Sequence, residues 1–257
     1  RRIFFMNEKT LQSSQTDANK QEVIDDILQN LPVDTEIELT LPSKCKFYNL
    51  PDPHSPVSVK PLTFEDEKAI ANIKASEKID PISFLLSKSV SNLNLSELLP
   101  MDKLYILYKI REISYGPMYP VLITCPKCKE DSEVNIDLSN LLVNEVPDDL
   151  EDPRTIMLPT LKKEAVVKFP RLKDEKYLNL LNSKNAQLWR FIESIDGHSD
   201  KQIISKVLEK MPLVDMHLIL KELGRPEYGI DSKINFICGA CEGESIVDIP
   251  IGENFFS

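Results

Sequence analysis

The sequence predicts an α+β protein in which two mainly helical lobes are joined by a small zinc-ribbon-like antiparallel sheet. Three observations predict this class. Two Cys-x-x-Cys motifs, Cys125–Cys128 and Cys238–Cys241, are each flanked by segments that alternate apolar and polar residues as strands do. Helical periodicity fills the stretch before the first motif and the stretch between the two. The 257-residue chain is also long enough to bury a core without disulfide bonds.

The N-terminal quarter is predicted to be irregular in large part. Residues 1–20 are expected to form a flexible arm, because they contain a polar run without periodicity. Residues 21–61 are expected to hold a short helix, a strand and an extended segment. The helix has apolar residues at helical spacing from Val23 to Leu31, and residues 35–41 alternate as a half-buried strand does. The five prolines that follow predict an extended path without regular structure.

Residues 62–118 are predicted to form the first helical lobe. Thr63–Asp66 resembles a capping box and opens one helix, Asp80-Pro81 opens a second, and Asp102 precedes a third. This third helix is expected to end at Gly116-Pro117. Its buried stripe is predicted to consist of Leu104, Leu107, Tyr108 and Ile110.

Residues 119–146 and 230–257 are predicted to form a split zinc-ribbon-like β module, in which each half is a strand, a cysteine turn and a strand. Residues 147–229 are expected to be inserted between the halves as two short strands and a second helical lobe. The strands are predicted near 155–158 and 165–169, and the helical stretches at 173–182, at 185–195 around Trp189, after the cap Ser199-Asp200, and at 212–223 before Gly224.

The two cysteine motifs are copies of one unit. When Cys125 is aligned on Cys238, at an offset of 113 residues, Val134 falls on Val247, so the following strands share the same phase. Zinc takes four ligands in a tetrahedron, and one Cys-x-x-Cys turn offers two thiolates from one side. The sequence therefore predicts one structural zinc ion with four ligands: Cys125, Cys128, Cys238 and Cys241.

Other states of these cysteines stay open from the residues alone. Two disulfides are disfavoured because a cytoplasmic product rarely keeps them. A redox-active dithiol is disfavoured because neither motif begins a helix after a strand. Four cysteines also bind iron–sulfur clusters, so the sequence does not distinguish zinc from such a cluster. The fifth cysteine, Cys45, is expected to be a buried or bystander thiol.

The sequence does not predict an enzyme or a small-molecule substrate. Only three histidines are available as bases near neutral pH. His54 is expected in an exposed proline-rich loop, His198 in a structural turn, and His217 as a packing residue within a helix. The chain lacks the serine-hydrolase, phosphate-loop and zinc-protease motifs, and its 7 glycines argue against a nucleotide-binding loop.

Composition indicates protein partners. The chain has 41 acidic and 31 basic residues, a net charge of −10, which disfavours attraction to nucleic acid or anionic lipid. No window approaches the roughly 18 apolar residues of a membrane span. A soluble protein made in the cytoplasm, with no membrane association, is therefore expected.

Several motifs together resemble the baseplate hub subunit and hub-assembly family of contractile-tailed bacteriophages. In chain order they are Leu41–Lys44 with Phe47-Tyr48, Pro61–Glu67, Met101–Tyr105 continuing into Arg111–Gly116, the two cysteine motifs, Pro170-Arg171 with Asp174-Glu175, Leu188–Phe191, and Asn254–Phe256. The resemblance extends over residues 40–257.

The resemblance implies a structural or assembly role in the tail baseplate, with other baseplate or tail hub proteins as partners. It also implies the host cytoplasm as the location during assembly. It leaves open a homo-oligomer and whether the chain stays in the finished virion. Phe47, Tyr48, Phe255 and Phe256 are then candidates to contact neighbouring subunits, the alternative being that they pack on their own domain. The competing hypothesis is a zinc-ribbon adaptor that binds nucleic acid or a polymerase, although acidic residues around both cysteine turns argue against a basic patch.

Overall fold

A computed structural model of the chain describes residues 20–27, 36–50, 56–76, 80–178, 187–224, 227–251 and 253–256. The chain divides into two units, Arg1–Thr35 and Glu36–Ser257. In the first unit, residues 20–27 form a helix, as predicted, and its Val23, Ile24 and Ile27 are exposed. The predicted arm lies outside the described residues, except for Lys20 in this helix.

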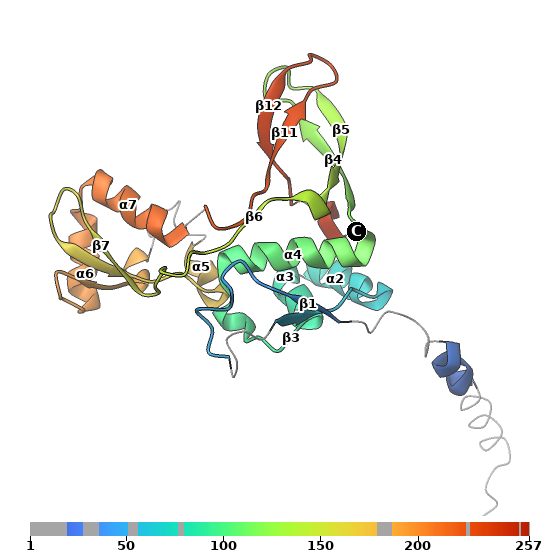
Figure 1. Cartoon of the computed structure of the whole chain (residues 1–257), viewed down its shortest axis with the longest axis horizontal. Coiled ribbons are helices and arrows are strands. Elements are labelled where there is room, and N and C mark those ends of the chain that lie inside the picture. The colour runs from blue at the N-terminus through green and yellow to red at the C-terminus, as the bar shows by residue number, and fades with distance from the viewer. Residues whose placement is uncertain are drawn as a thin grey trace, which may run out of the picture. The chain divides into compact units, whose positions relative to one another are not determined.

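The second unit contains small antiparallel sheets and helices (Figure 1). Its strands are β1 (Ile37–Leu39), β2 (Val57–Val59), β3 (Val90–Ser91), β4 (Met118–Thr124), β5 (Asp131–Asp137), β6 (Val143–Asn144), β7 (Arg154–Met157), β8 (Glu164–Val167), β9 (Ile192–Ile195), β10 (Gly229–Ile230), β11 (Lys233–Ile237) and β12 (Glu244–Asp248). Its α-helices are α2 (Phe64–Ser76), α3 (Pro81–Ser89), α4 (Pro100–Tyr115), α5 (Glu175–Leu178), α6 (Lys201–Glu209) and α7 (Leu213–Gly224). Short 3₁₀ helices are η2 (Leu95–Glu97), η3 (Leu138–Asn140), η4 (Leu172–Asp174), η5 (Leu188–Phe191) and η6 (Glu253–Phe256).

Helices α2 and α3 begin where the sequence predicts, and α4 ends where it predicts. In α2 the Thr63 hydroxyl accepts the Asp66 amide, and the Asp66 carboxylate accepts the Thr63 amide, which is a reciprocal capping box. In α3 the Asp80 carboxylate accepts the Ser83 amide and Pro81 occupies the first turn. Helix α4 ends at Gly116, whose φ of 89° suits a residue without a Cβ.

Two predictions for this region are wrong. The proline-rich segment is not free of regular structure, because β2 lies inside it as the central strand of the sheet β1-β2-β3. Val57 and Val59 of that strand are fully buried, so their burial outweighs the neighbouring prolines. Asp102 does not precede α4 but lies in its first turn, and its buried carboxylate accepts the Ser43 amide and the Tyr48 hydroxyl.

The predicted single ribbon-like sheet is wrong. Each cysteine motif sits in its own two-stranded sheet, β4-β5 and β11-β12, and no described strand of one pairs with a strand of the other. Figure 1 shows the two hairpins side by side beyond α4. The physical reason is that the contact between them runs through side chains at the turns and at the hairpin bases, without a shared hydrogen-bond ladder.

The short strands predicted near 155–158 and 165–169 are present as β7 and β8, and the helices predicted after Ser199-Asp200 and at 212–223 are present as α6 and α7. The prediction that this second lobe is mainly helical is wrong. The lobe is built on the three-stranded sheet β7-β8-β9, with α6 and α7 packed against it. Residues 192–195, predicted as helix, form strand β9, because Ile192 and Ile195 complete the buried face next to Ala165 and Val167. These residues belong to a separate hydrophobic core from the one under α4.

The aromatic residues proposed for contacts with neighbouring subunits pack on their own unit. Tyr48, Phe255 and Phe256 are buried, and Phe47 is partly buried with its ring 5.7 Å from that of Phe169. The Phe255 ring makes edge-to-face contacts with Phe256, and with two tyrosines of α4 and β4. This cluster fixes the base of the first cysteine hairpin to α4.

Candidate metal centre

The two cysteine turns have the same backbone conformation. In the first, the Cys125 amide donates to the carbonyl of Glu130, and the Lys129 amide donates to the carbonyl of Cys125. The second repeats both bonds at the equivalent positions, from Cys238 to Gly243 and from Glu242 to Cys238. The fifth residue of each turn is left-handed, with φ of 68° at Lys129 and 53° at Glu242. The sequence repeat is therefore also a repeat of structure.

These turns bring four sulfur atoms together. The Sγ atoms of the four cysteines all lie within 4.8 Å of one another. The close pairs join the two hairpins, at 3.8 Å between Cys125 and Cys241 and 3.6 Å between Cys128 and Cys238. Cys125 and Cys238 are buried, Cys128 is half-buried and Cys241 is exposed.

The sulfur positions fit a single tetrahedral ion. Zinc–thiolate bonds of about 2.3 Å place the sulfurs of a tetrahedron about 3.8 Å apart. The observed close pairs match this separation, and they exceed the roughly 2.05 Å of a disulfide, so all four thiols are free. In a four-iron cluster each thiolate binds a different iron atom, which separates the sulfurs more than a shared ion does. The geometry therefore suits one ion with four thiolates.

Backbone amides favour the thiolate form at the first cysteine of each turn. Amides of Cys128 and Lys127 lower the pKa of Cys125, and amides of Cys241 and Ala240 lower the pKa of Cys238 to about 6. One of these is the Ala240 N–H, 3.4 Å from the Cys238 sulfur. Metal ions bind the thiolate, so the turns prepare two of the four groups for binding.

Lys127 supplies a positive charge beside the sulfur cluster. A divalent ion with four thiolates carries two negative charges, which a nearby cation stabilises. Lys127 extends across to the second hairpin at Gly243, where an added Cβ would lie 2.8 Å from the lysine Cδ and 3.1 Å from the Cys241 sulfur. A glycine at this position thus makes room for the lysine next to the thiolate.

The two hairpins are held unequally by the rest of the protein. Strand β4 buries Tyr119, Val121 and Ile123 in alternation, whereas Phe236 is the one buried residue of β11 and β12 has none. A direct link between the hairpin bases is the Tyr119 hydroxyl, which donates to the Pro250 carbonyl at 3.0 Å. The second hairpin therefore depends more on the sulfur cluster for its position.

A third turn of the same form was missed from the sequence. The residues Leu158-Pro159-Thr160-Leu161-Lys162-Lys163, between β7 and β8, repeat the two backbone hydrogen bonds and the left-handed fifth residue, with φ of 55° at Lys162. Leu158 and Leu161 stand where the other turns have cysteine. The signal was present in the sequence, because Glu164-x-x-Val167-x-x-Pro170 repeats Glu244-x-x-Val247-x-x-Pro250.

In this third turn a carboxylate takes the place of the thiolate. The amides of Thr160 and Leu161 donate to the two carboxylate oxygens of Asp215 in α7, at 2.7 and 2.9 Å. Equivalent amides in the cysteine turns point at a cysteine sulfur. Asp215 is fully buried, so the turn amides supply the hydrogen bonds that water would give to an exposed carboxylate.

The family model described as T4 bacteriophage base plate protein matches residues 35–257. The chain belongs to this family. No curated protein and no solved structure gave a match. The match begins at the boundary between the two units and includes both cysteine turns and the third turn.

The remaining candidate residues of this baseplate family member are its three histidines and Cys45. His198 is exposed, and its backbone pairs with Ile195 in a turn, as the sequence predicts. His217 is exposed on α7, so the prediction that it packs against apolar neighbours is wrong. His54 lies outside the described residues. Cys45 is buried beside Asp102, and burial and then that carboxylate raise the pKa of its thiol to about 11.

Among the helices that the structure describes, none combines the length and the apolar character needed to cross a bilayer.

Proposed function

We propose that this chain is a structural or assembly protein of the phage baseplate hub, that it acts through protein–protein contacts, and that a structural zinc ion joins its two cysteine hairpins. The observation that carries the proposal is the family match over residues 35–257, which gives the baseplate role. The hub location and the zinc ion go beyond that match.

The sulfur cluster supports a structural role for the metal. Four thiolates fill a tetrahedral shell and leave no open position for substrate or water. The ligands come from two hairpins that share no hydrogen-bond ladder, so the ion would fix their relative position. Residues Cys125, Cys128, Cys238 and Cys241 would hold it.

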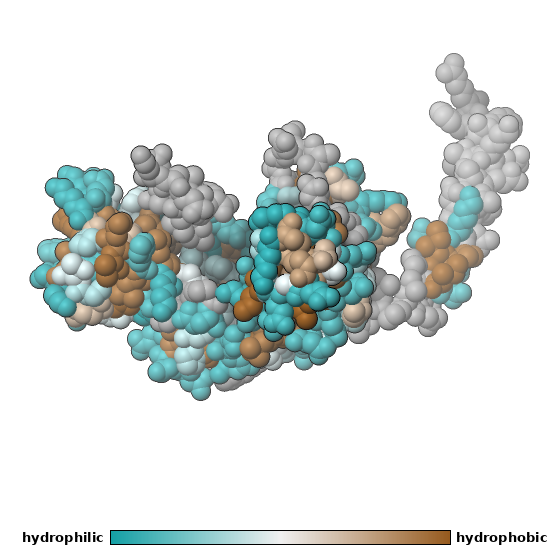
Figure 2. Space-filling model, turned by 90° about the horizontal axis from the view of Figure 1, so that it is seen from above, coloured by the Kyte–Doolittle hydropathy of each residue, from teal (hydrophilic) through white to brown (hydrophobic). Residues whose placement is uncertain are grey.

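Exposed apolar side chains support contacts with other proteins. Figure 2 shows apolar residues gathered on the part of the molecule formed by the second core. The large ones that are exposed there are Met157, Leu161, Ile203, Leu213 and Val214. Groups of exposed apolar residues on a soluble protein mark interaction surfaces.

The hub role is tested by quantitative mass spectrometry of purified virions from a host that produces the phage. Several copies per particle, retained when tail tubes are stripped from the baseplate, support a structural subunit. Absence from virions together with baseplates that fail to assemble without the chain supports an assembly factor. Normal baseplates and full infectivity without the chain would contradict both.

The metal is tested by elemental analysis of the purified protein. We expect about one zinc per chain, and no iron. The Cys128→Ser and Cys241→Ser variants should lose it, whereas Cys45→Ser, the matched control outside the cluster, should keep it. Iron with visible absorption, or zinc retained in both cluster variants, would contradict the zinc centre.

The alternative of a nucleic-acid or polymerase adaptor lacks a specific observation in its favour. It relied on a ribbon sheet, and the two hairpins form separate sheets. Lysines at the first turn are accompanied by Glu130 and Asp131, and the second turn carries Glu242 and Glu244. Such a surface does not attract phosphates.

A further inference from the structure

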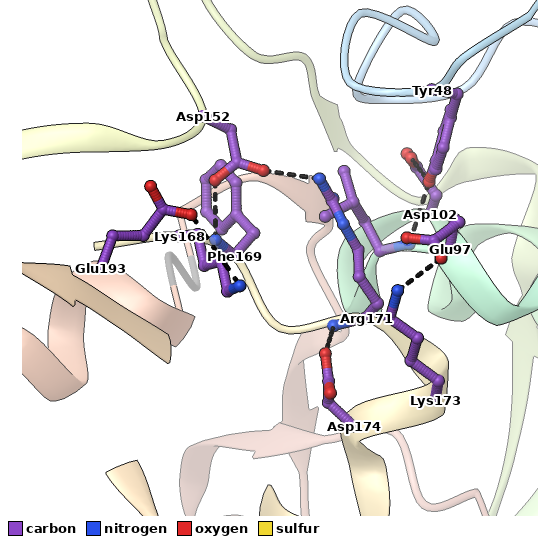
Figure 3. Close-up of polar contacts among 11 residues, drawn as sticks. Tyr48, Glu97, Asp102, Asp152, Lys168, Phe169, Arg171, Lys173, Asp174 and Glu193 are labelled. Atoms are coloured by element: carbon purple, nitrogen blue, oxygen red, sulfur yellow. Dashed lines mark hydrogen bonds and ion pairs between the residues drawn. The ribbon is translucent and has the colours of Figure 1, made fainter. Parts of the chain in front are cut away.

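A cleft of about 490 Å³ lies beside the segment that leads from the β7-β8-β9 sheet to α5. Its walls come from η2, from the segment 168–174, from η5 and from the start of α6. Five cations line it: Lys168, Arg171, Lys173, Arg190 and Lys201. Figure 3 shows three of them with their carboxylate neighbours.

Two of the five cations form ion pairs with carboxylates of the wall. Arg171 donates to Asp152 at 2.6 Å, and Lys173 pairs with Glu97 at 2.5 Å. The third carboxylate of the wall, Asp174, accepts the backbone amide of Arg171 at 3.0 Å. These pairs build the cleft and connect it to η2.

The other three cations are not matched in this way. Lys168 has Glu193 as its carboxylate neighbour, at 3.9 Å and with both side chains more than two-fifths exposed. Lys201 donates to the Ile192 carbonyl at 2.7 Å. In the part of the chain that the structure describes, neither Lys201 nor Arg190 forms an ion pair within 4.0 Å.

Arg190 lies among polar and aromatic groups. Its Nε donates to the Gln187 side-chain oxygen at 2.5 Å. Its guanidinium lies 4.0 Å from the ring centre of Tyr177 and 4.6 Å from that of Trp189, which also lines the cleft. Cation–π contacts thus help to position the charge, and within the described residues the terminal N–H groups of Arg190 have no carboxylate partner.

Lys168 and Lys201 repel each other across the cleft. Desolvation and then the charge of Lys168 lower the pKa of Lys201. An anion placed between the two ammonium groups would offset this repulsion. The net charge of the chain is −10, so such a gathering of cations differs from the surface as a whole.

We infer that this cleft binds the carboxylates of an acidic, aromatic-containing segment on another baseplate protein. The inference rests on the proposed function, in which protein contacts carry the role of the chain. A peptide fits better than nucleic acid, because Glu97, Asp152 and Asp174 in the wall would repel a continuous run of phosphates. One or two carboxylates can be placed at Lys168, Arg190 and Lys201, with an aromatic ring against Trp189.

The test uses the zinc-loaded full chain and a capped heptapeptide with four acidic residues and one phenylalanine. Trp189 is the one tryptophan of the sequence, so its fluorescence reports binding directly. The comparison ligands are the same peptide with amides in place of acids, inorganic phosphate, and a single-stranded oligonucleotide. We expect saturable binding of the acidic peptide that weakens as salt is added.

Matched double variants locate the site. Lys168→Gln with Lys201→Gln should weaken peptide binding about tenfold, because each exposed or half-exposed ion pair contributes up to about fivefold. Lys60→Gln with Lys88→Gln removes the same charge from exposed lysines elsewhere and should change binding less than about twofold. Circular dichroism melting checks that both variants stay folded.

Four outcomes would overturn the inference: equal binding of the amide peptide, equal loss in the two double variants, tighter binding of the oligonucleotide, or saturation by inorganic phosphate with no response to the peptide. Copies of the chain in virions are measured independently, so absence of peptide binding would leave the baseplate role untouched.

Discussion

Zinc removal is expected to unfold the β11–β12 hairpin before any other described element of the second unit. The hairpin region buries two large apolar side chains, Phe236 and Ile249, which contribute about 3–6 kcal/mol together. A structural zinc site contributes about 10–16 kcal/mol. The proposed metal would therefore be the larger stabilising term for this hairpin, because two strands alone are marginal in water.

The β4–β5 hairpin should respond less. It buries Tyr119, Val121, Ile123 and Ile136, about 6–12 kcal/mol of apolar burial, and its base is packed against Phe255. The β7–β8 hairpin should not respond, because a carboxylate and not a metal satisfies its turn. The structure thus predicts an order of loss: β11–β12 first, β4–β5 partly, β7–β8 unchanged.

Hydrogen exchange with mass spectrometry measures this order. The zinc-loaded protein, the chelated protein and the Cys241→Ser variant are compared, with Cys45→Ser as the control that keeps the cluster. Faster exchange should be concentrated in peptides from β11 and β12. If these peptides stay as protected without zinc as with it, or if the β7–β8 peptides lose protection to the same extent, the reasoning is refuted.

Three further substitutions test other parts of the account. Tyr48→Phe removes the hydroxyl that donates to Asp102 and accepts the Leu99 amide. The free energy of unfolding in urea titrations should fall by about 1–3 kcal/mol, with an unchanged zinc content. An unchanged free energy of unfolding would contradict a structural role for this hydroxyl. Asp215→Ala leaves two turn amides without their acceptor. The free energy of unfolding should fall by about 2–4 kcal/mol, again with zinc retained. A variant as stable as the parent would mean that water replaces the carboxylate. Lys127→Gln should weaken zinc binding about two- to fivefold in a chelator competition, and an unchanged affinity would show that its charge does not act on the thiolates.

The sequence predicted the features that depend on local rules. The cap at Thr63, the Pro81 start and the stop at Gly116 all appear in the structure, because each is decided by a few neighbouring residues. The convergence of the four cysteines was also predicted, since tetrahedral coordination requires partners for each pair of thiolates. The family followed from several weak motifs in order.

What the sequence did not predict depends on long-range packing. The helical pattern around Trp189 gave no sign that residues 192–195 would become the third strand of a sheet, because short apolar runs fit a helix and a strand equally. Asp102 carries the signature of a helix cap, but its role is set by Tyr48, which is far away in the chain. The assumption of one ribbon sheet failed because sharing an ion does not require sharing hydrogen bonds.

The third turn explains why cysteines are needed at two hairpins and not at the third. All three turns direct backbone amides at one point, and such a point requires a negative group. Where a helix packs over the turn, as α7 does over β7–β8, an aspartate from that helix meets the need and apolar leucines fill the cysteine positions. Where the two cysteine hairpins meet, each turn supplies its own thiolates, and the proposed metal ion would offset the charge of the four thiolates. The Asp215 contact and the sulfur cluster are thus two solutions to the same electrostatic requirement. In an Asp215→Cys variant, the new side chain would accept both turn amides only as a thiolate. The free energy of unfolding of this variant should therefore reach that of the parent only above the pKa of the new thiol.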